Sequence, residues 1–274
     1  METDIRPDLP LDEVDALIER YHSPLWAFNL IEREKENSNT YRVLHHLERY
    51  WFVRDYLEKY EMQDGHRCIR PENESDLLGP APYGACLIDC GCGRGLGLRE
   101  LAKANLNLLL AGIESDTATC KELPEVVGDF QFYNENIETC KPRYPALSDF
   151  IICFEVLGFT TLSSDEALLR KLDSFCMRQG VIFLSTPNYR DRSKKKYFNR
   201  IYNPQTFAEL VTKNLPGYRM GFYGQLYPTN RKIGFRDLGV QPLEQLSAEP
   251  DFLIAVAKKN DSIIQAEVQQ ETDI

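Results

Sequence analysis

The spacing of apolar positions along the chain changes near residue 85. Beyond that point, apolar residues gather in strand-sized runs that alternate with helical stretches, which is typical of a parallel sheet with crossover helices. The pattern therefore predicts an α/β fold. We expect seven strands, at Ala85–Asp89, Leu106–Glu114, Phe130–Tyr133, Phe150–Phe154, Val181–Ser185, Tyr218–Tyr223 and Phe252–Ala257.

The first 83 residues are predicted to form a helical N-terminal cap and a lid loop. A helix over Thr40–Met62 carries apolar side chains on more than one stripe, so we expect it to pack on two sides. The stretch from Gln63 to Gly84 is polar and rich in Pro and Gly, which indicates a loop. The main domain should then span residues 84–258, and residues 259–274 should form a disordered tail.

Two helices between the later strands have predictable ends. Ser163-Ser164-Asp165-Glu166 offers a capping box for a helix that runs to Arg178, and Gly180 is placed to end it. Asn203-Pro204 offers an N-cap and a first-turn proline for a helix over Gln205–Asn214. These helices would connect the fourth strand to the fifth and the fifth to the sixth.

Composition and charge exclude several classes of function. The 274 residues carry 32 basic and 42 acidic side chains, a net charge of −10, so the surface lacks the positive field that binds nucleic-acid polymers. No apolar run approaches the roughly 20 residues of a membrane-spanning helix, and the acidic N-terminus does not read as a secretory signal. We therefore expect a cytoplasmic protein that binds neither nucleic acid nor membrane and keeps its eight cysteines reduced. Only Cys90 and Cys92 are closely spaced, so no metal site is expected.

The segment from Asp89 to Gly95 carries the strongest chemical signal. Its glycines follow a predicted strand and precede a predicted helix, so the backbone can approach a ligand closely and the helix start offers free N–H groups. A dinucleotide site requires G-x-G-x-x-G, and all three frames fail because Leu96, Leu98 and Glu100 stand where the last glycine should be. NAD and FAD are therefore disfavoured.

The spacing Asp-x-Gly-x-Gly-x-Gly from Asp89 to Gly95 resembles motif I of the class I S-adenosylmethionine-dependent methyltransferases. The resemblance implies S-adenosylmethionine as cofactor, with Glu114 at the end of the second strand binding its ribose hydroxyls. It also implies a Rossmann-like, doubly wound sheet of seven mostly parallel strands whose last strand is antiparallel. The cofactor-binding residues that it implies are Asp89, Gly91, Cys92, Gly93, Gly95, Glu114, Ser115, Asn136, Ile137, Phe154 and Leu157.

Two further motifs are similar to one subgroup of this family, which includes small-molecule, quinone and sugar O- or N-methyltransferases. Phe154-Glu155-Val156-Leu157 resembles its fourth-strand motif, and Ser185-Thr186-Pro187-Asn188 resembles the end of its fifth strand. In the subgroup an acid and a histidine follow the fourth-strand motif. Gly158 and Phe159 occupy those two positions here, so the subgroup's acid and base are missing from this turn.

The candidates for a catalytic role are His46, Glu155 and Tyr189. A hydroxyl acceptor often needs a general base, whereas an amine needs only to be unprotonated. By helical spacing, His46 shares a face of its helix with Tyr50 and Val53. Catalysis by proximity and desolvation alone is the alternative, and the acceptor atom, O, N or C, stays open.

A basic segment, Arg190 to Arg200, holds six basic residues and one acidic residue. We expect it to bind an anionic small-molecule acceptor, such as a phosphorylated or nucleotide-linked sugar. A solvated loop is the competing interpretation, and a methyltransferase-like scaffold without catalysis is the competing function. The candidate substrate-binding residues are Arg190, Arg192, Lys194, Lys195 and Lys196.

Overall fold

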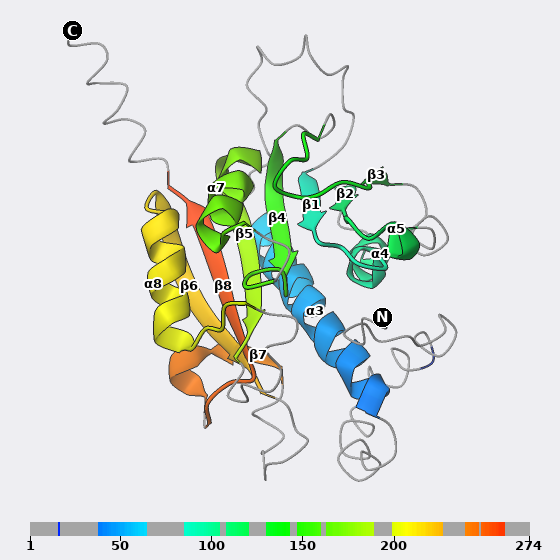
Figure 1. Cartoon of the computed structure of the whole chain (residues 1–274). Coiled ribbons are helices and arrows are strands. Elements are labelled where there is room, and N and C mark those ends of the chain that lie inside the picture. Colours follow the sequence, from blue (N-terminus) through cyan, green and yellow to red (C-terminus); the bar gives the residue numbers. More distant parts are fainter. Residues whose placement is uncertain are drawn as a thin grey trace, which may run out of the picture.

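The computed structural model describes residue 16 and residues 38–64, 85–104, 108–120, 130–142, 147–159, 163–188, 199–226, 239–246 and 248–260. Within these residues, eight strands form a single sheet in the order β3-β2-β1-β4-β5-β8-β6-β7 (Figure 1). The strands are β1 Cys86–Cys90, β2 Leu109–Ile113, β3 Gln131–Tyr133, β4 Ser148–Phe154, β5 Cys176–Pro187, β6 Tyr218–Gln225, β7 Val240–Pro242 and β8 Phe252–Lys259. Each of the seven predicted strands overlaps one of them.

The pairing of the strands confirms the predicted doubly wound α/β sheet. Strands β3, β2, β1, β4 and β5 pair in parallel, and the last strand, β8, is antiparallel to both β5 and β6. The predicted count of seven is wrong, because β7 adds a short strand antiparallel to β6. Three residues that follow Gly239 and include Pro242 are too few to show an alternating pattern, so tertiary pairing alone defines this strand.

Helices cover both faces of the sheet (Figure 1). Successive side chains of a strand point to opposite faces. In β4, Phe150 and Ile152 pack with helices α3 and α4, while Ile151 and Cys153 pack with α7 and α8. Burial on both faces explains why the central strands read as continuous apolar runs. The helices are α3 Ser38–Asp64, α4 Leu96–Lys103, α5 Thr117–Cys120, α7 Asp165–Phe175 and α8 Pro204–Asn214, with the short 3-10 helix η5 Leu243–Gln245.

Both helices start where predicted, but the capping box expected at α7 does not form, since the Ser163 hydroxyl donates to the Glu138 carboxylate instead. The Ser164 side chain caps α7 by accepting a 2.9 Å hydrogen bond from the Ala167 N–H. Asn203 caps α8 in a full capping box with Thr206, and Pro204 occupies the first turn. These ends were predictable because capping is local in sequence.

The predicted end of α7 is wrong. The helix ends at Phe175, and Cys176 is already extended, with φ −84° and ψ 123°, because β5 begins there and pairs with Ser148 of β4. Gly180 therefore lies within the strand rather than at a helix end. A Cβ at Gly180 would lie 2.7 Å from Cys176 Sγ, so close packing is what requires glycine there.

Helix α3 packs on the sheet and on α4, in agreement with the predicted two-sided packing. Val53 and Leu57 belong to the same core cluster as the strand residue Phe183. On another side of the helix, Trp51 Nε1 donates a 3.4 Å hydrogen bond to Glu100 of α4. The division of the chain at residue 83 stays a prediction, and residues 261–274 of the predicted tail lie outside the described residues.

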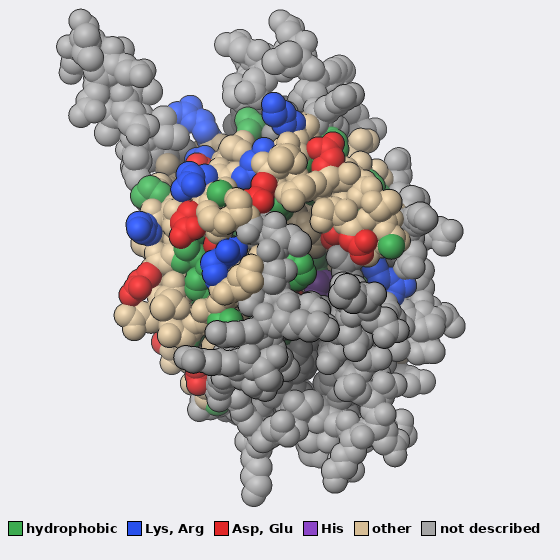
Figure 2. Space-filling model, viewed as in Figure 1, with side chains coloured by type: hydrophobic (Ala, Val, Ile, Leu, Met, Phe, Trp, Pro, Cys, Tyr) green, Lys and Arg blue, Asp and Glu red, His purple; other side chains and the backbone are tan. Residues whose placement is uncertain are grey.

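The described surface carries no single dominant charge on the face that Figure 2 shows. Acidic and basic side chains are interspersed over α7, α8 and the neighbouring strands. Among the described helices, none is long and apolar enough to cross a bilayer. The cytoplasmic location stays a prediction.

Candidate active site

The sheet has a topological switch point at the carboxyl end of β1. From β1 the chain continues to β2 on one side, while β4 pairs with the other side of β1. Crevices at such points are the usual ligand sites of open α/β sheets. The glycine turn after β1, Glu114 after β2 and Glu155 after β4 all follow strands that meet at this edge.

The glycine turn is held over the end of β2. The N–H groups of Gly91 and Cys92 donate to the carbonyl oxygen of Ile113, at 2.8 and 3.1 Å. Gly91 (φ 91°) packs against the turn after β4, since a Cβ there would lie 2.5 Å from Val156 Cγ2. Gly93 (φ 57°) has nothing within 4 Å of the place where a Cβ would stand, so the turn is open above it. The turn therefore combines close packing on one side with room for a ligand on the other.

Glu114 is bound to the same turn. The residue is 6% exposed; its Oε2 accepts a 3.0 Å hydrogen bond from the Gly93 N–H, and Oε1 accepts one of 2.9 Å from the Asp116 N–H. These two bonds hold the carboxylate beside the open part of the turn. Its predicted role in binding ribose hydroxyls stays a prediction.

Asp89 is fully buried at the end of β1. Its Oδ2 accepts a 2.8 Å hydrogen bond from the Tyr50 hydroxyl of α3, while Oδ1 has no hydrogen-bond partner among the described residues. Burial raises the pKa of Asp89, the Tyr50 hydrogen bond lowers it and the charge of Glu114 raises it, to about 7 overall. The Tyr50 ring lies directly on α4, because a Cβ at Gly97 would be 2.1 Å from it.

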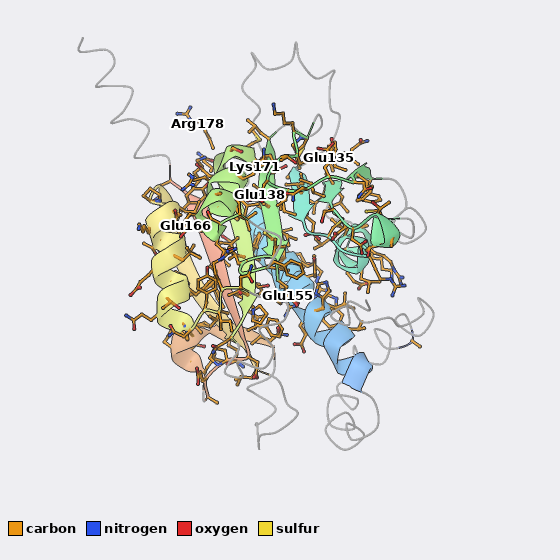
Figure 3. All side chains as sticks on the ribbon, viewed as in Figure 1. Glu135, Glu138, Glu155, Glu166, Lys171 and Arg178 are labelled. Atoms are coloured by element: carbon orange, nitrogen blue, oxygen red, sulfur yellow. The ribbon has the colours of Figure 1, made fainter. Side chains whose placement is uncertain are left out.

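A second polar cluster follows β4 and includes two side chains of α3. Glu155 Oε1 accepts a hydrogen bond from Arg49 Nη2 and lies 3.4 Å from His46 Nδ1. Figure 3 shows Glu155 beside α3, at the end of the sheet. Burial alone would raise the pKa of Glu155, but the charge of Arg49 and the contacts with His46 lower it to about 2. The carboxylate is therefore ionised at neutral pH.

Arg49 connects this cluster to β6. The side chain is 1% exposed, and Nη1 donates a 3.0 Å hydrogen bond to Gln225 Oε1. Its guanidinium also lies 4.3 Å from the centre of the Phe252 ring, a cation–π contact. A buried guanidinium with partners on two strands fixes the position of α3 over the site.

The comparisons with solved structures agree with this fold. The plantazolicin methyltransferase BpumL, in complex with a monoazolic desmethylPZN analog and SAH, is 14% identical, with a TM-score of 0.55 over 91% of this chain and 98% of that chain. The plantazolicin methyltransferase BamL, in complex with a triazolic desmethylPZN analog and SAH, is 16% identical, with a TM-score of 0.53 over 90% of this chain and 95% of that chain. At these identities the likeness shows the fold. No curated protein matches the sequence.

A family described as a methyltransferase domain matches residues 56–214, from within α3 to the end of α8. This chain belongs to the methyltransferase domain family. Membership confirms the prediction of an S-adenosylmethionine-dependent methyltransferase. The roles of individual residues in this methyltransferase stay predictions.

The structure brings together most of the predicted cofactor residues of the methyltransferase. Asp89, the glycine turn with Cys92, and Glu114 share one site, and Phe154 borders it through its contact with the Tyr50 ring, 5.2 Å between centres. Leu157, in contrast, is fully buried in the core cluster that α7 and α8 share.

The predicted residues Ser115, Asn136 and Ile137 follow the neighbouring strands β2 and β3. Ser115 is exposed after β2. Asn136 begins a turn, in which its Oδ1 accepts a 2.8 Å hydrogen bond from the Glu138 N–H, and Ile137 is buried in that turn. The residues that lie outside the described part of the chain are Tyr189, Arg190, Arg192, Lys194, Lys195 and Lys196.

Sequence analysis missed Arg49 as a site residue and missed the role of Tyr50. Both lie one helical turn beyond His46, at i+3 and i+4, and therefore on the same side of α3. A histidine, an arginine and a tyrosine on the side of the helix that also carries the buried Val53 are the signal that could have found them. Among the described residues, no group of three His, Cys, Asp or Glu side chains could hold a metal ion.

Proposed function

We propose that this methyltransferase transfers the methyl group of S-adenosylmethionine to a small-molecule acceptor at the carboxyl edge of β1 and β4. One observation carries the location of the site. The Glu114 carboxylate is held beside the open backbone of Gly93, with the unpartnered, buried Oδ1 of Asp89 at the end of the adjacent strand. Two carboxylates next to an open stretch of backbone suit a cofactor with hydroxyl, ammonium and sulfonium groups.

Each part of the cofactor has residues that fit it. When bound, S-adenosylmethionine supplies an electrophilic methyl group on a positively charged sulfur. Glu114 would accept hydrogen bonds from the ribose hydroxyls, and Asp89 Oδ1 would accept one from the ammonium of the methionine part. The glycine turn would contact the methionine part of the cofactor closely. The adenine would lie toward Ser115, Asn136 and Ile137.

For the acceptor, we propose an anionic small molecule such as a phosphorylated or nucleotide-linked sugar. The basic segment motivates this choice, and the described contacts at its two ends support it. The Asn188 N–H donates to the Asp251 carbonyl oxygen at 2.8 Å, and the Asn199 N–H donates to the Gly158 carbonyl oxygen at 2.9 Å. Asn188 follows β5, and Gly158, which binds Asn199, follows β4. Both ends of the segment therefore lie at the carboxyl edge of the sheet.

A titration calorimetry experiment tests the cofactor site. Wild-type protein should bind S-adenosylmethionine and its demethylated product, and Glu114→Ala should weaken binding by roughly 1.5–3 kcal/mol, as expected for hydrogen bonds to a charged group. Gly93→Val should abolish binding, because it fills the open space with a branched side chain at a left-handed backbone position. Glu58→Gln, an exposed change on α3, is the control. Unchanged affinity in both site variants would refute the location.

A transfer assay separates the acceptor proposal from the competing scaffold function. Methyl-labelled cofactor is incubated with the protein and a fractionated metabolite extract. Transfer to an anionic fraction is expected, and neutralising Lys194, Lys195 and Lys196 together should raise the acceptor KM. Unchanged KM would refute an anionic acceptor, whereas cofactor binding without any transfer would favour the scaffold.

A further inference from the structure

His46 and Glu155 stand 109 residues apart in sequence and meet in the structure. Their side chains are 27% and 25% exposed, whereas Arg49, the third member of the cluster, is 1% exposed. The pair is therefore the part of the cluster that a ligand can reach. It lies next to the cofactor site proposed above, since the His46 ring is 5.2 Å from the ring of Tyr50, which binds Asp89.

We propose that His46 is the general base of the reaction, that Glu155 positions it, and that the acceptor is therefore a hydroxyl group. This inference rests on the proposed function and names the acceptor atom that the function leaves open. The turn after β4 holds Gly158 and Phe159 where the related subgroup has its acid and histidine. Helix α3 instead brings the His46 imidazole to this turn.

The backbone of Glu155 supports a positioning role. Its φ of 60° lies in the left-handed region, which is unfavourable for a residue with a side chain. The conformation is held by the Glu155 N–H, which donates to the Ser185 carbonyl oxygen at 3.0 Å. Strain of this kind persists where the surrounding structure determines it, and here it directs a carboxylate toward α3.

The charges around His46 determine which ring nitrogen can act. Glu155 Oε1 lies 3.4 Å and Arg49 Nη2 lies 3.2 Å from the same atom, His46 Nδ1. If Nδ1–H donates to Glu155, Nε2 keeps its lone pair and can accept a proton. We assign this tautomer, because the ionised carboxylate stabilises the imidazolium that forms and offsets the repulsion from Arg49. Tyr50, also on α3, contributes a neutral ring to this environment.

The proposed step balances in atoms and charge. The acceptor oxygen forms a bond to the methyl carbon as the carbon–sulfur bond breaks, and that electron pair stays on sulfur, which becomes a neutral thioether. The hydroxyl proton moves to His46 Nε2, giving an imidazolium beside Glu155. Solvent later removes that proton. A hydroxyl requires this help because it is a weak nucleophile until its proton is removed, and it does not lose that proton to water at neutral pH. A free amine attacks through a lone pair that is already available.

Nitrogen NMR on protein labelled at its histidines tests the geometry without any cofactor. The His46 signals are assigned by their loss in His46→Gln. We expect the Nδ1–H tautomer in the wild type and the loss of that tautomer preference in Glu155→Gln. Glu58→Gln on the same helix, whose side chain is 51% exposed, should leave the His46 signals unchanged. An Nε2–H tautomer in the wild type would overturn the proposal, even if Glu155→Gln does not fold.

The acceptor atom is tested with carbon-13 methyl-labelled S-adenosylmethionine and a deproteinised metabolite extract, since the product's methyl shift distinguishes oxygen from nitrogen and carbon. We expect an O-methyl product, a kcat about 100- to 1000-fold lower in His46→Gln with cofactor affinity unchanged, and partial rescue of His46→Ala by imidazole. An N- or C-methyl product, or full activity in His46→Gln, would overturn the proposal. Intact cofactor binding with no transfer would instead refute the proposed function itself.

Discussion

The Tyr50 hydroxyl of α3 donates a 2.8 Å hydrogen bond to Asp89 at the end of β1, between residues 39 positions apart. The bond joins the N-terminal helix to the acid of the glycine motif. Since Asp89 is fully buried, this helix covers the acid that the cofactor's ammonium would approach. Cofactor affinity should therefore depend on a residue outside the glycine motif.

Replacing Tyr50 by phenylalanine tests that dependence. The ring keeps its contacts with Phe154 and α4, but the hydrogen bond that lowers the pKa of Asp89 is lost, so this pKa should rise above about 7. At pH 7 less of the carboxylate is ionised, and we expect affinity for S-adenosylmethionine to fall about 3- to 10-fold, the effect of one hydrogen bond. Calorimetry at pH 7 measures the change. Equal affinity would show that Asp89 does not contact the cofactor.

The pKa of Asp89 also predicts how cofactor binding depends on pH. The ionised carboxylate attracts an ammonium group, and with a pKa of about 7 its ionised fraction falls as the pH is lowered. Affinity should drop by about tenfold or somewhat more from pH 7 to pH 5.5, where the cofactor's amino group stays protonated. Asp89→Asn should bind weakly and with little pH dependence over this range. A wild-type affinity that is flat between these pH values would contradict the prediction.

Asp165 anchors the chain that returns after the basic segment. Its fully buried carboxylate accepts hydrogen bonds from the Gly158 N–H at 2.8 Å, from Arg200 Nε at 2.7 Å and from the Tyr202 hydroxyl. Asp165→Asn removes the charge that pairs with Arg200, and we expect the free energy of unfolding to fall by about 2–4 kcal/mol. Urea denaturation measures this loss.

The matched control for that variant is Asp55→Asn. Asp55 also pairs with an arginine, Arg54, but its side chain is 53% exposed, so the change should alter stability by less than about 0.5 kcal/mol. Similar losses in the two variants would show that the Asp165 cluster contributes no more than a surface pair.

Gly97→Ala tests the contact between α3 and α4. A Cβ at this position would lie 2.1 Å from the Tyr50 ring, so the ring and with it the helix must shift. We expect a loss of about 1–3 kcal/mol in the free energy of unfolding, together with weaker cofactor binding, because the shift displaces the hydroxyl from Asp89. Gly217→Ala is the control, since nothing lies within 4 Å of its Cβ position. Thermal and urea unfolding of both variants check the prediction, which fails if Gly97→Ala is as stable as the wild type.

Local signals explain what could be predicted of the fold, and a competing interaction explains the error at α7. The caps Ser164 and Asn203 were predictable because a cap and the N–H groups that it binds lie within three residues. The end of α7 was not, because pairing of β5 with β4, distant in sequence, outweighs the helical preference of the residues after Phe175.

Apart from β7, the sequence by itself determined the order of the strands, the glycine turn from Asp89 to Gly95 and the place of Glu114 after β2, because hydrophobic periodicity and turn chemistry act over short distances along the chain. Only the tertiary structure decided which groups join them. The packing of α3 on the sheet brings Tyr50 to Asp89 and His46 to Glu155. Burial of its apolar side chains drives that packing, and burial depends on surfaces that exist only once the sheet has formed.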